Sequence, residues 1–404
     1  MQLKLLQTYR ILSNFAISLI MEFIPFIILG YMLPKYSLSY SLTMMFIFWA
    51  AQNLFLVIFN KLFQKLYVTK PQIFLLLRIV PIVCCEICIL FLYTNNIFLI
   101  LLTAVFSGLE NSFNYQPTDI IWNFVSEGTD ERKLAFTNFL DQMGWLIAGI
   151  VGGAFLDYIP QWIVVAFSLT LFVASAVPIF IFYFKFRKTP YFNADYISSI
   201  AQREAENQKL KKIQKSFIRD HFITFVLIAP TWYLFYYLTS ATLYLSTGSF
   251  FITGTVTSIF DGLYGFACLY CGKFLTKVDG KKYACMVAIY MCIVMLVIYF
   301  VPNLIVRIAV FESVAFVQPI LNMYKYHNFL DKARILGLGN KVTLNQNNAT
   351  ISSNAICYTV GAIGGMLPIV IFSVCMALVG SAALSRLDSK LNKNLVDFLS
   401  GNDS

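Results

Sequence analysis

The sequence is poor in charged residues and nearly devoid of histidine. Of its 404 residues only 12% are Asp, Glu, Lys or Arg, and two are His. It lacks the His-Glu-x-x-His motif of zinc peptidases and the Gly-x-x-x-x-Gly-Lys-Ser/Thr loop that binds nucleotide phosphates. His221 and His327 flank apolar segments rather than lying inside them, which excludes a paired-histidine site within those segments. We therefore predict no enzyme, no metal site and no cofactor.

Apolar length is what the sequence has in excess. Hydrophobic residues make up 59% of the chain and aromatic residues 17%, and the mean hydropathy is +0.72. Runs near 20 residues recur along the chain, which is the length a helix needs to cross a hydrocarbon core of about 30 Å. They are too long for barrel strands, and backbone groups in lipid must be satisfied within the segment. We predict helical spans near residues 10–34, 38–62, 72–93, 96–125, 135–157, 160–184, 221–247, 249–272, 282–300, 302–325, 347–366 and 368–386.

The cations lie almost entirely on one side of these spans. With both termini on the same side, every Lys and Arg except Lys35 and Arg307 falls in a segment of that side. The positive-inside rule therefore predicts cytoplasmic termini and a multi-pass protein of the cell membrane, in contact with the lipid bilayer. The net charge of +10 is then a sign of topology. No basic soluble domain is present, so we expect no nucleic-acid partner.

Cysteine occurs where a disulfide framework is not expected. Cys84, Cys85, Cys88, Cys268 and Cys271 all lie inside predicted spans. The short loops predicted on the outer side contain none. We expect these side chains to act as small apolar residues.

Two stretches of the first half recur in the second half in the same order. Residues 110–117 (ENSFNYQP) correspond to 312–319 (ESVAFVQP), and residues 148–153 (AGIVGG) correspond to 360–365 (VGAIGG). Two landmarks in matching order indicate that the chain is two copies of one unit. A duplicated membrane unit is typical of transporters that bind their ligand between the copies.

The repeat and the spans define the domain organisation. We predict an N-terminal six-helix bundle (1–184), a cytoplasmic linker (185–220), a C-terminal six-helix bundle (221–386) and a cytoplasmic tail (387–404). The fold class is an all-α integral membrane protein with twelve transmembrane helices in two pseudo-symmetric bundles. Small residues let helices approach closely. We expect such packing at Gly149, Gly152, Gly153, Gly361, Gly364 and Gly365.

This organisation resembles the major facilitator superfamily of secondary transporters. Members carry a Gly-x-x-x-Asp-Arg-x-x-Gly-Arg-Arg-like loop after the second span, often echoed after the eighth. The loop at 60–70 keeps the cations but lacks the Gly and the Asp. A copy resembling the second loop supplies the predicted gating residues Gly272, Lys277, Asp279, Gly280 and Lys281. In the resembled fold the glycine-rich stretch of the fifth span would pack on the eighth span, and that of the eleventh on the second.

Ionisable groups at membrane depth are energetically expensive and are therefore candidates for function. The predicted substrate or proton site comprises Glu22, Glu110, Arg307, Glu312, Asp261, Gln116, Gln318, Trp232 and Tyr236. Glu86 and Asp141 rank lower. For each acid the alternative is a structural hydrogen bond or ion pair, and for the two glutamines it is satisfaction of backbone groups freed by the following proline. Arg307 is expected to reach Glu22 or Glu110, or to extend to the outer water.

Acids outnumber cations among these groups, which favours a cation or a proton over an anion. Aromatic faces such as those around Tyr236 bind apolar cations and also stack on sugars. The resemblance implies a monomeric, proton-coupled secondary transporter of a small organic solute that works by alternating access. The alternative is a non-transporting sensor or assembly subunit on a decayed transporter scaffold.

Overall fold

The computed structural model describes residues 2–125, 131–186, 208–231, 234–275, 280–324 and 339–399. The described elements are all helical. The first half contains α1 (Gln2–Ser18), η1 (Met21–Phe23), α2 (Ile24–Met32), α3 (Leu38–Thr69), α4 (Pro71–Leu77), α5 (Ile79–Leu90), η2 (Leu92–Thr94), α6 (Ile97–Val125), α7 (Glu131–Tyr158) and α8 (Gln161–Phe186). The second half contains α10 (Gln208–Ile228), η4 (Ala229–Thr231), α11 (Leu234–Thr247), α12 (Phe250–Leu275), α13 (Gly280–Phe300), α14 (Leu304–Tyr324), α16 (Gly339–Gly364) and α17 (Met366–Leu399).

These helices make twelve membrane spans, because three spans are broken into shorter pieces. The first span bends by 41° between α1 and the η1–α2 segment, and Pro25 stands in the first turn of α2. The third span divides into α4 and α5 at Arg78, and the seventh divides at η4 into α10 and α11. By length and apolarity alone, seven described helices qualify as spans, or eight with the bent pair. The remaining spans are identified by their place beside these helices in the fold.

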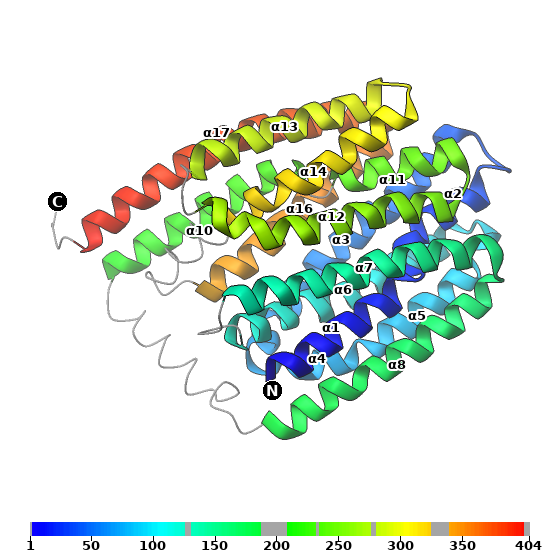
Figure 1. Ribbon diagram of the computed structural model, residues 1–404, viewed down its shortest axis with the longest axis horizontal. Helices are drawn as coiled ribbons and strands as arrows, with labels where there is room; N and C mark the ends of the chain where they lie inside the picture. Colours follow the sequence, from blue (N-terminus) through cyan, green and yellow to red (C-terminus); the bar gives the residue numbers. More distant parts are fainter. Residues whose placement is uncertain are drawn as a thin grey trace.

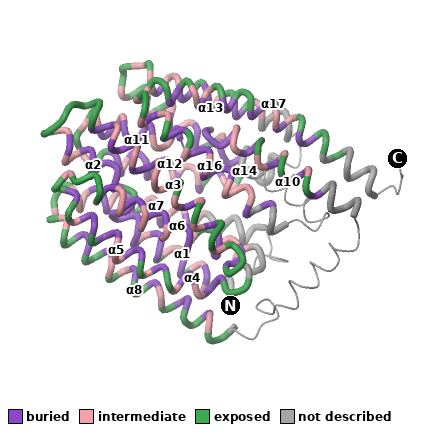
Figure 2. The backbone as a smooth tube through the Cα atoms, turned by 180° about the vertical axis from the view of Figure 1, so that it is seen from behind, coloured by how far each residue is buried: buried purple, intermediate pink, exposed green. Residues whose placement is uncertain are grey.

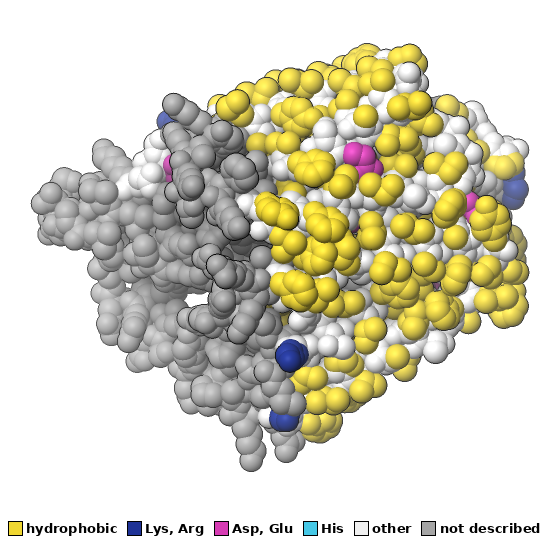
Figure 3. Space-filling model, in the orientation of Figure 1, with side chains coloured by type: hydrophobic (Ala, Val, Ile, Leu, Met, Phe, Trp, Pro, Cys, Tyr) yellow, Lys and Arg dark blue, Asp and Glu magenta, His cyan; other side chains and the backbone are white. Residues whose placement is uncertain are grey.

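The helices run side by side along one axis, and the start of α1 and the end of α17 lie at the same end of the bundle (Figure 1). We call this the terminal end and the opposite one the distal end. Buried residues follow the inner faces of the helices, while exposed residues collect on the outer helices and at the distal turns (Figure 2). The described outer surface in Figure 3 is mainly hydrophobic with few charged side chains, as a lipid-facing surface requires.

The contacts between helices repeat from one half to the other. Within the halves, α1 packs on α8 as α10 packs on α17, and α5 packs on α6 as α13 packs on α14. Between the halves, α7 packs on α12 and α3 on α16. Pro117 and Pro319 each lie inside a helix, α6 and α14 respectively, and these two helices are equivalent in this pattern. The two-bundle prediction from the repeat is therefore confirmed.

Glycines set the distance between α7 and its neighbours. A Cβ atom added at Gly153 would lie 2.5 Å from the carbonyl oxygen of Phe250 in α12, and one at Gly152 would lie 2.6 Å from that of Leu19, just after α1. Gly149 also faces α12 across from Gly254. The packing prediction is therefore confirmed for this stretch, with α1 as an additional partner.

The second glycine stretch behaves differently. Gly361 packs on Phe46 of α3, as predicted, and a Cβ atom added at Gly364 would lie 2.8 Å from Pro368 of α17 rather than against the second span. The prediction of close packing is wrong for Gly365. Gly365 has φ +82° and open space around it. Its N–H donates to the carbonyl of Gly361 at 2.7 Å, which ends α16. Gly365 therefore makes the sharp turn into α17 instead of a helix contact.

Helices α10 and α17 extend into the segments predicted as linker and tail. Helix α10 begins at Gln208, inside the predicted linker, and α17 continues to Leu399, inside the predicted tail. The Lys390 ammonium pairs with the Asp220 carboxylate and so ties these extensions together. Partial burial raises the pKa of Asp220, but hydrogen bonds from Lys390 and Arg219 outweigh it and leave the pKa below its usual value.

Candidate functional site

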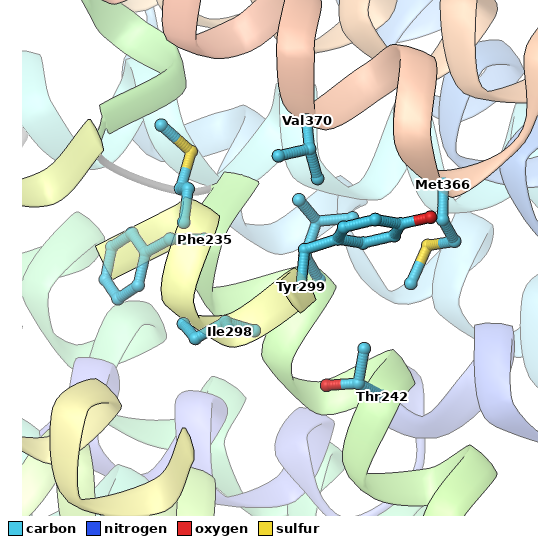
Figure 4. Close-up of a pocket in the computed structure, with 8 residues that line it drawn as sticks. Phe235, Thr242, Ile298, Tyr299, Met366 and Val370 are labelled. Carbon is cyan, nitrogen blue, oxygen red and sulfur yellow. The ribbon is translucent and has the colours of Figure 1, made fainter. Parts of the chain in front are cut away.

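A cavity of about 380 Å³ lies between the two halves. The first half contributes side chains from α1, η1, α2, α6 and α7, and the second half contributes side chains from α11, α12 and α14. The size falls within the range of small-molecule sites. A further hollow between α11, α13 and α17 holds only about 10 Å³ and is lined mainly by apolar side chains such as Phe235, Ile298 and Val370 (Figure 4). The larger cavity is therefore the candidate site.

Two carboxylates line this cavity, one from each half of the protein. Glu22 lies in η1, at the bend of the first span, and its side chain is exposed to the cavity space. Asp261 lies in the middle of α12 and is half-buried. Tyr236 of α11 donates a hydrogen bond to Asp261 Oδ2 at 3.3 Å. Among the described residues, no Lys or Arg forms an ion pair with either acid.

Aromatic rings line the cavity beside both acids. Phe23 and Phe26 stand next to Glu22 on η1 and α2, and Phe260 stands next to Asp261 on α12. The ring of Tyr236 packs edge-on against Phe260, with centroids 5.7 Å apart. Trp145, Tyr115, Tyr237 and Tyr264 complete the aromatic lining. The walls thus combine apolar faces with two acids from different halves.

Toward the terminal end, the cavity reaches an ion pair that is already satisfied. Arg10 Nη2 donates to Asp141 Oδ2 at 2.6 Å, and Asn14 Nδ2 donates to Asp141 Oδ1 at 3.0 Å. The Arg10 guanidinium also lies 4.8 Å from the ring centroid of Trp122. On α6, Asp119 accepts a hydrogen bond from Asn347 of α16 at 2.6 Å. Asp141 therefore serves the first half as an ion-pair partner.

Glu110, a predicted site residue, lies outside the cavity lining. It is 1% exposed and pairs with Arg78, also 1% exposed, whose Nε and Nη2 both lie 2.5 Å from Glu110 Oε1. Arg78 Nη1 also donates to the hydroxyl of Tyr9 at 3.2 Å, and its guanidinium lies 5.4 Å from the ring of Phe172. The group joins α1, α6, α8 and the junction between α4 and α5 within the first half.

Arg78 is a deep cation that the sequence reasoning missed. It falls inside the predicted span 72–93, although the topology argument assigns it to the side that holds both termini. Its place in an otherwise apolar run was the available signal. Arg78, and not Arg307, is the cation that pairs with Glu110.

Arg307 does not reach Glu22 or Glu110. Its Nε donates to the carbonyl of Val301 at 2.5 Å, in the distal turn between α13 and α14. The expectation of an acidic partner is thus contradicted, and the side chain instead lies at the distal end. A single turn of helix from the span end lets the long side chain reach back to a free carbonyl.

Glu312 sits behind the cavity rather than on its wall. Both carboxylate oxygens are enclosed and have no hydrogen-bond partner among the described atoms. Glu312 is close enough to Asp261 for the two charges to interact. Its repeat counterpart Glu110 has Arg78, whereas residues 283–300 of α13 contain no Lys or Arg. The two halves therefore differ in whether the equivalent glutamate has a cationic partner among the described residues.

The remaining predicted residues are dispersed. Gln318 lines the cavity, while Gln116 donates from Nε2 to Asn348 Oδ1 at 3.2 Å and joins α6 to α16. Glu86 accepts a hydrogen bond from Ser168 at 2.7 Å inside the first half. Trp232, Lys277 and Asp279 lie outside the described residues. Only the backbone is described for Gly272, Gly280 and Lys281, at the end of α12 and the start of α13.

At the distal end the halves are joined by a cap across the α7–α12 contact. The Asp157 carboxylate, in the last turn of α7, accepts from the N–H groups of Phe250 and Phe251 at 3.1 and 2.9 Å. It also accepts from the hydroxyl of Ser249 at 2.7 Å. A carboxylate at a helix N-terminus is stabilising. This cap fastens the first half to the start of α12.

Twelve spans in two equivalent halves around a shared cavity define a transport protein of the secondary-transporter class. The family model described as Major Facilitator Superfamily matches residues 10–346. The chain belongs to this superfamily of membrane transport proteins, which are not enzymes. A search of curated protein sequences finds no match.

Solved structures show the same fold at low sequence identity. A bacterial homologue of the iron transporter ferroportin in its inward-facing state has a TM-score of 0.67 and 12% identity, covering 96% of this chain and 98% of that one. A D-xylose–proton symporter has a TM-score of 0.61 and 12% identity, covering 94% and 95%. A nucleoside transporter has a TM-score of 0.60 and 13% identity, covering 96% and 99%. These structures support the architecture of the fold. The substrate class has to be inferred from the residues that line the cavity.

Proposed function

We propose that this protein is a proton-coupled secondary active transporter of a small organic solute. The observation that carries the proposal is the cavity between the halves, which holds Glu22 from one half and Asp261 from the other, with no cationic partner for either acid among the described residues. Carboxylates at membrane depth can take up and release a proton as they are exposed to one side or the other. Rocking of the two halves about the cavity would provide that alternation.

The contacts between halves are suited to such a movement. The α7–α12 contact is built on glycine, and at the distal end it is fastened by hydrogen bonds to Asp157. Hydrogen bonds of this kind can break in one state and form again in the other. We further propose that the protein is a monomer in the cell membrane with both termini cytoplasmic. The one-sided distribution of Lys and Arg supports this orientation of the termini.

Flux into proteoliposomes tests the proposal. The purified protein is reconstituted, and uptake of an organic cation, a pentose, a nucleoside and a dipeptide is measured with and without an imposed pH gradient. At least one solute should accumulate faster with the gradient, and a protonophore should abolish the difference. Protein-free vesicles give the leak. Absence of protein-dependent flux for every solute under both conditions would favour a sensor or assembly subunit instead.

A further inference from the structure

We propose that the central cavity takes a monovalent organic cation with an aromatic or branched apolar body, its charge held between Glu22 and Asp261. The transport step of this inference rests on the proposed function, whereas binding can be measured without transport. The inference depends on the charge balance of the cavity, the aromatic rings beside the two acids and the state of the nearby hydroxyl groups.

The charge balance favours a cation. Among the described lining residues Arg10 is the one cation, and Asp141 neutralises it at 2.6 Å. Asp119 is occupied by the neutral amide of Asn347. Glu22 and Asp261 therefore add negative charge that no described cation of the lining offsets. In surroundings of low dielectric, this charge attracts a cation and repels an anion far more strongly than it would in water.

The rings beside the acids favour an organic cation over an inorganic one. Phe23 and Phe26 flank Glu22, while Tyr236 and Phe260 flank Asp261. A cation placed between the acids would contact ring faces, which bind alkylammonium groups well. A hard divalent ion instead requires six or more oxygen ligands. The described part of the chain contains no group of three or more His, Cys, Asp or Glu side chains arranged for a metal.

The hydroxyl groups near Asp261 disfavour a sugar. Thr253 and Thr257 donate to the carbonyls of Ser249 and Thr253 in their own helix, at 2.9 and 3.0 Å. Ser240 likewise donates to the carbonyl of Tyr236 at 2.8 Å. Their donor hydrogens are already used. A polyol needs many directed hydrogen bonds from its site, whereas an apolar cation needs charge and ring faces.

A cation in this position would compete with a proton for the same carboxylates. When the cation binds, the O–H bond of a protonated acid breaks and the proton passes to water, so the charge of the site is conserved. The reverse step releases the cation. Exchange of one organic cation for a proton therefore follows from a shared site, because both occupants cannot neutralise the same carboxylate at once.

Binding to the purified full-length protein tests the inference. The probe is benzyltrimethylammonium, with benzenesulfonate as an anion of similar size, and affinity is measured by titration calorimetry at constant pH. The cation should bind and the anion should not. Glu22→Gln and Asp261→Asn should each weaken the cation by about tenfold, which corresponds to the loss of one favourable charge contact. Asp220→Asn removes the same charge far from the cavity and should leave the affinity unchanged.

Tyr236 provides a second variant pair that separates charge from ring. Tyr236→Phe keeps the ring face and should bind the cation within about threefold of wild type, whereas Tyr236→Leu should lose about tenfold. Each variant is used only if its thermal melting and gel-filtration profile match those of wild type. Equal affinity for benzenesulfonate, or unchanged cation affinity in both acid variants, would overturn the proposal.

The flux and binding experiments can refute the transport function and the substrate class independently. Cation binding that depends on Glu22 and Asp261, without flux of any solute, would refute the transport function and leave the site intact. Proton-dependent flux of a pentose or nucleoside, without cation binding, would refute the substrate class and leave the transport function intact.

Discussion

The buried Arg78–Glu110 pair gives a sharp test of what a deep acid does in this protein. Replacing Arg78 with Gln leaves the Glu110 carboxylate enclosed at 1% exposure with its guanidinium partner gone. Removing one partner of a buried ion pair typically destabilises a protein by about 3–5 kcal/mol. The loss should fall at the upper part of that range, because Arg78 also donates to Tyr9 and lies over Phe172.

The double variant gives the decisive comparison. In Arg78→Gln with Glu110→Gln, two neutral amides occupy the site and no uncompensated charge remains. We expect its stability to lie closer to wild type than that of Arg78→Gln alone. Lys390→Gln is the control, because it breaks a partly exposed pair with Asp220. That change should cost at most about 1 kcal/mol.

Thermal unfolding with a thiol-reactive fluorescent dye is a suitable assay. Cys85, Cys88, Cys292 and Cys357 are free and buried, so the dye reacts when the helices separate. Flux per folded molecule is measured on the same preparations. Glu110→Gln should lower stability and keep the pH-driven flux. Normal stability with lost pH-driven flux would instead make Glu110 a proton site and refute the structural assignment.

Two further substitutions test the contact between the halves. Gly153→Ala places a methyl group 2.5 Å from the carbonyl oxygen of Phe250 and should destabilise the protein by about 1–3 kcal/mol. Gly144→Ala on the same helix is the control, because its methyl group meets only Ile11, at 3.5 Å, and should be nearly neutral. Equal melting temperatures for the two variants would show that α7 and α12 are not held this closely. Asp157→Ala removes the acceptor of three hydrogen bonds at the start of α12 and should cost about 1 kcal/mol of stability in thermal unfolding. A melting temperature equal to that of wild type would show that the cap does not hold the halves together.

The sequence predicts which residues lie within the membrane spans, but it does not predict which way their side chains point around the helix. Apolar runs and the two repeated stretches predicted the twelve spans and the pairing of the halves, because membrane thickness and duplication leave marks at regular spacing. The same marks do not say which way a side chain points around its helix. Glu110 and Glu312 hold equivalent positions in the repeat, yet one pairs with Arg78 and the other has no partner among the described atoms.

The errors have identifiable physical causes. Arg78 stands only seven residues after Pro71, so a count based on loops assigned it to the surface although it is 1% exposed. Arg307 was paired with distant acids, but its long side chain satisfies a carbonyl in the nearby turn. Gly364 and Gly365 match the repeat in sequence, yet a positive φ at Gly365 turns the chain there. The sequence does not separate Asp261 from Glu110, because the contact of Asp261 with Tyr236 and with the cavity depends on tertiary packing.

The central claim is that Glu22 and Asp261 exchange an organic cation for a proton. The most direct measurement uses proteoliposomes that contain a trapped pH-sensitive dye, with benzyltrimethylammonium added outside and the membrane potential clamped. Entry of the cation should drive protons out and make the interior alkaline, and the double variant Glu22→Gln with Asp261→Asn should abolish the signal while Asp220→Asn retains it. Cation uptake with no movement of protons, or an equal signal in the double variant, would contradict the account.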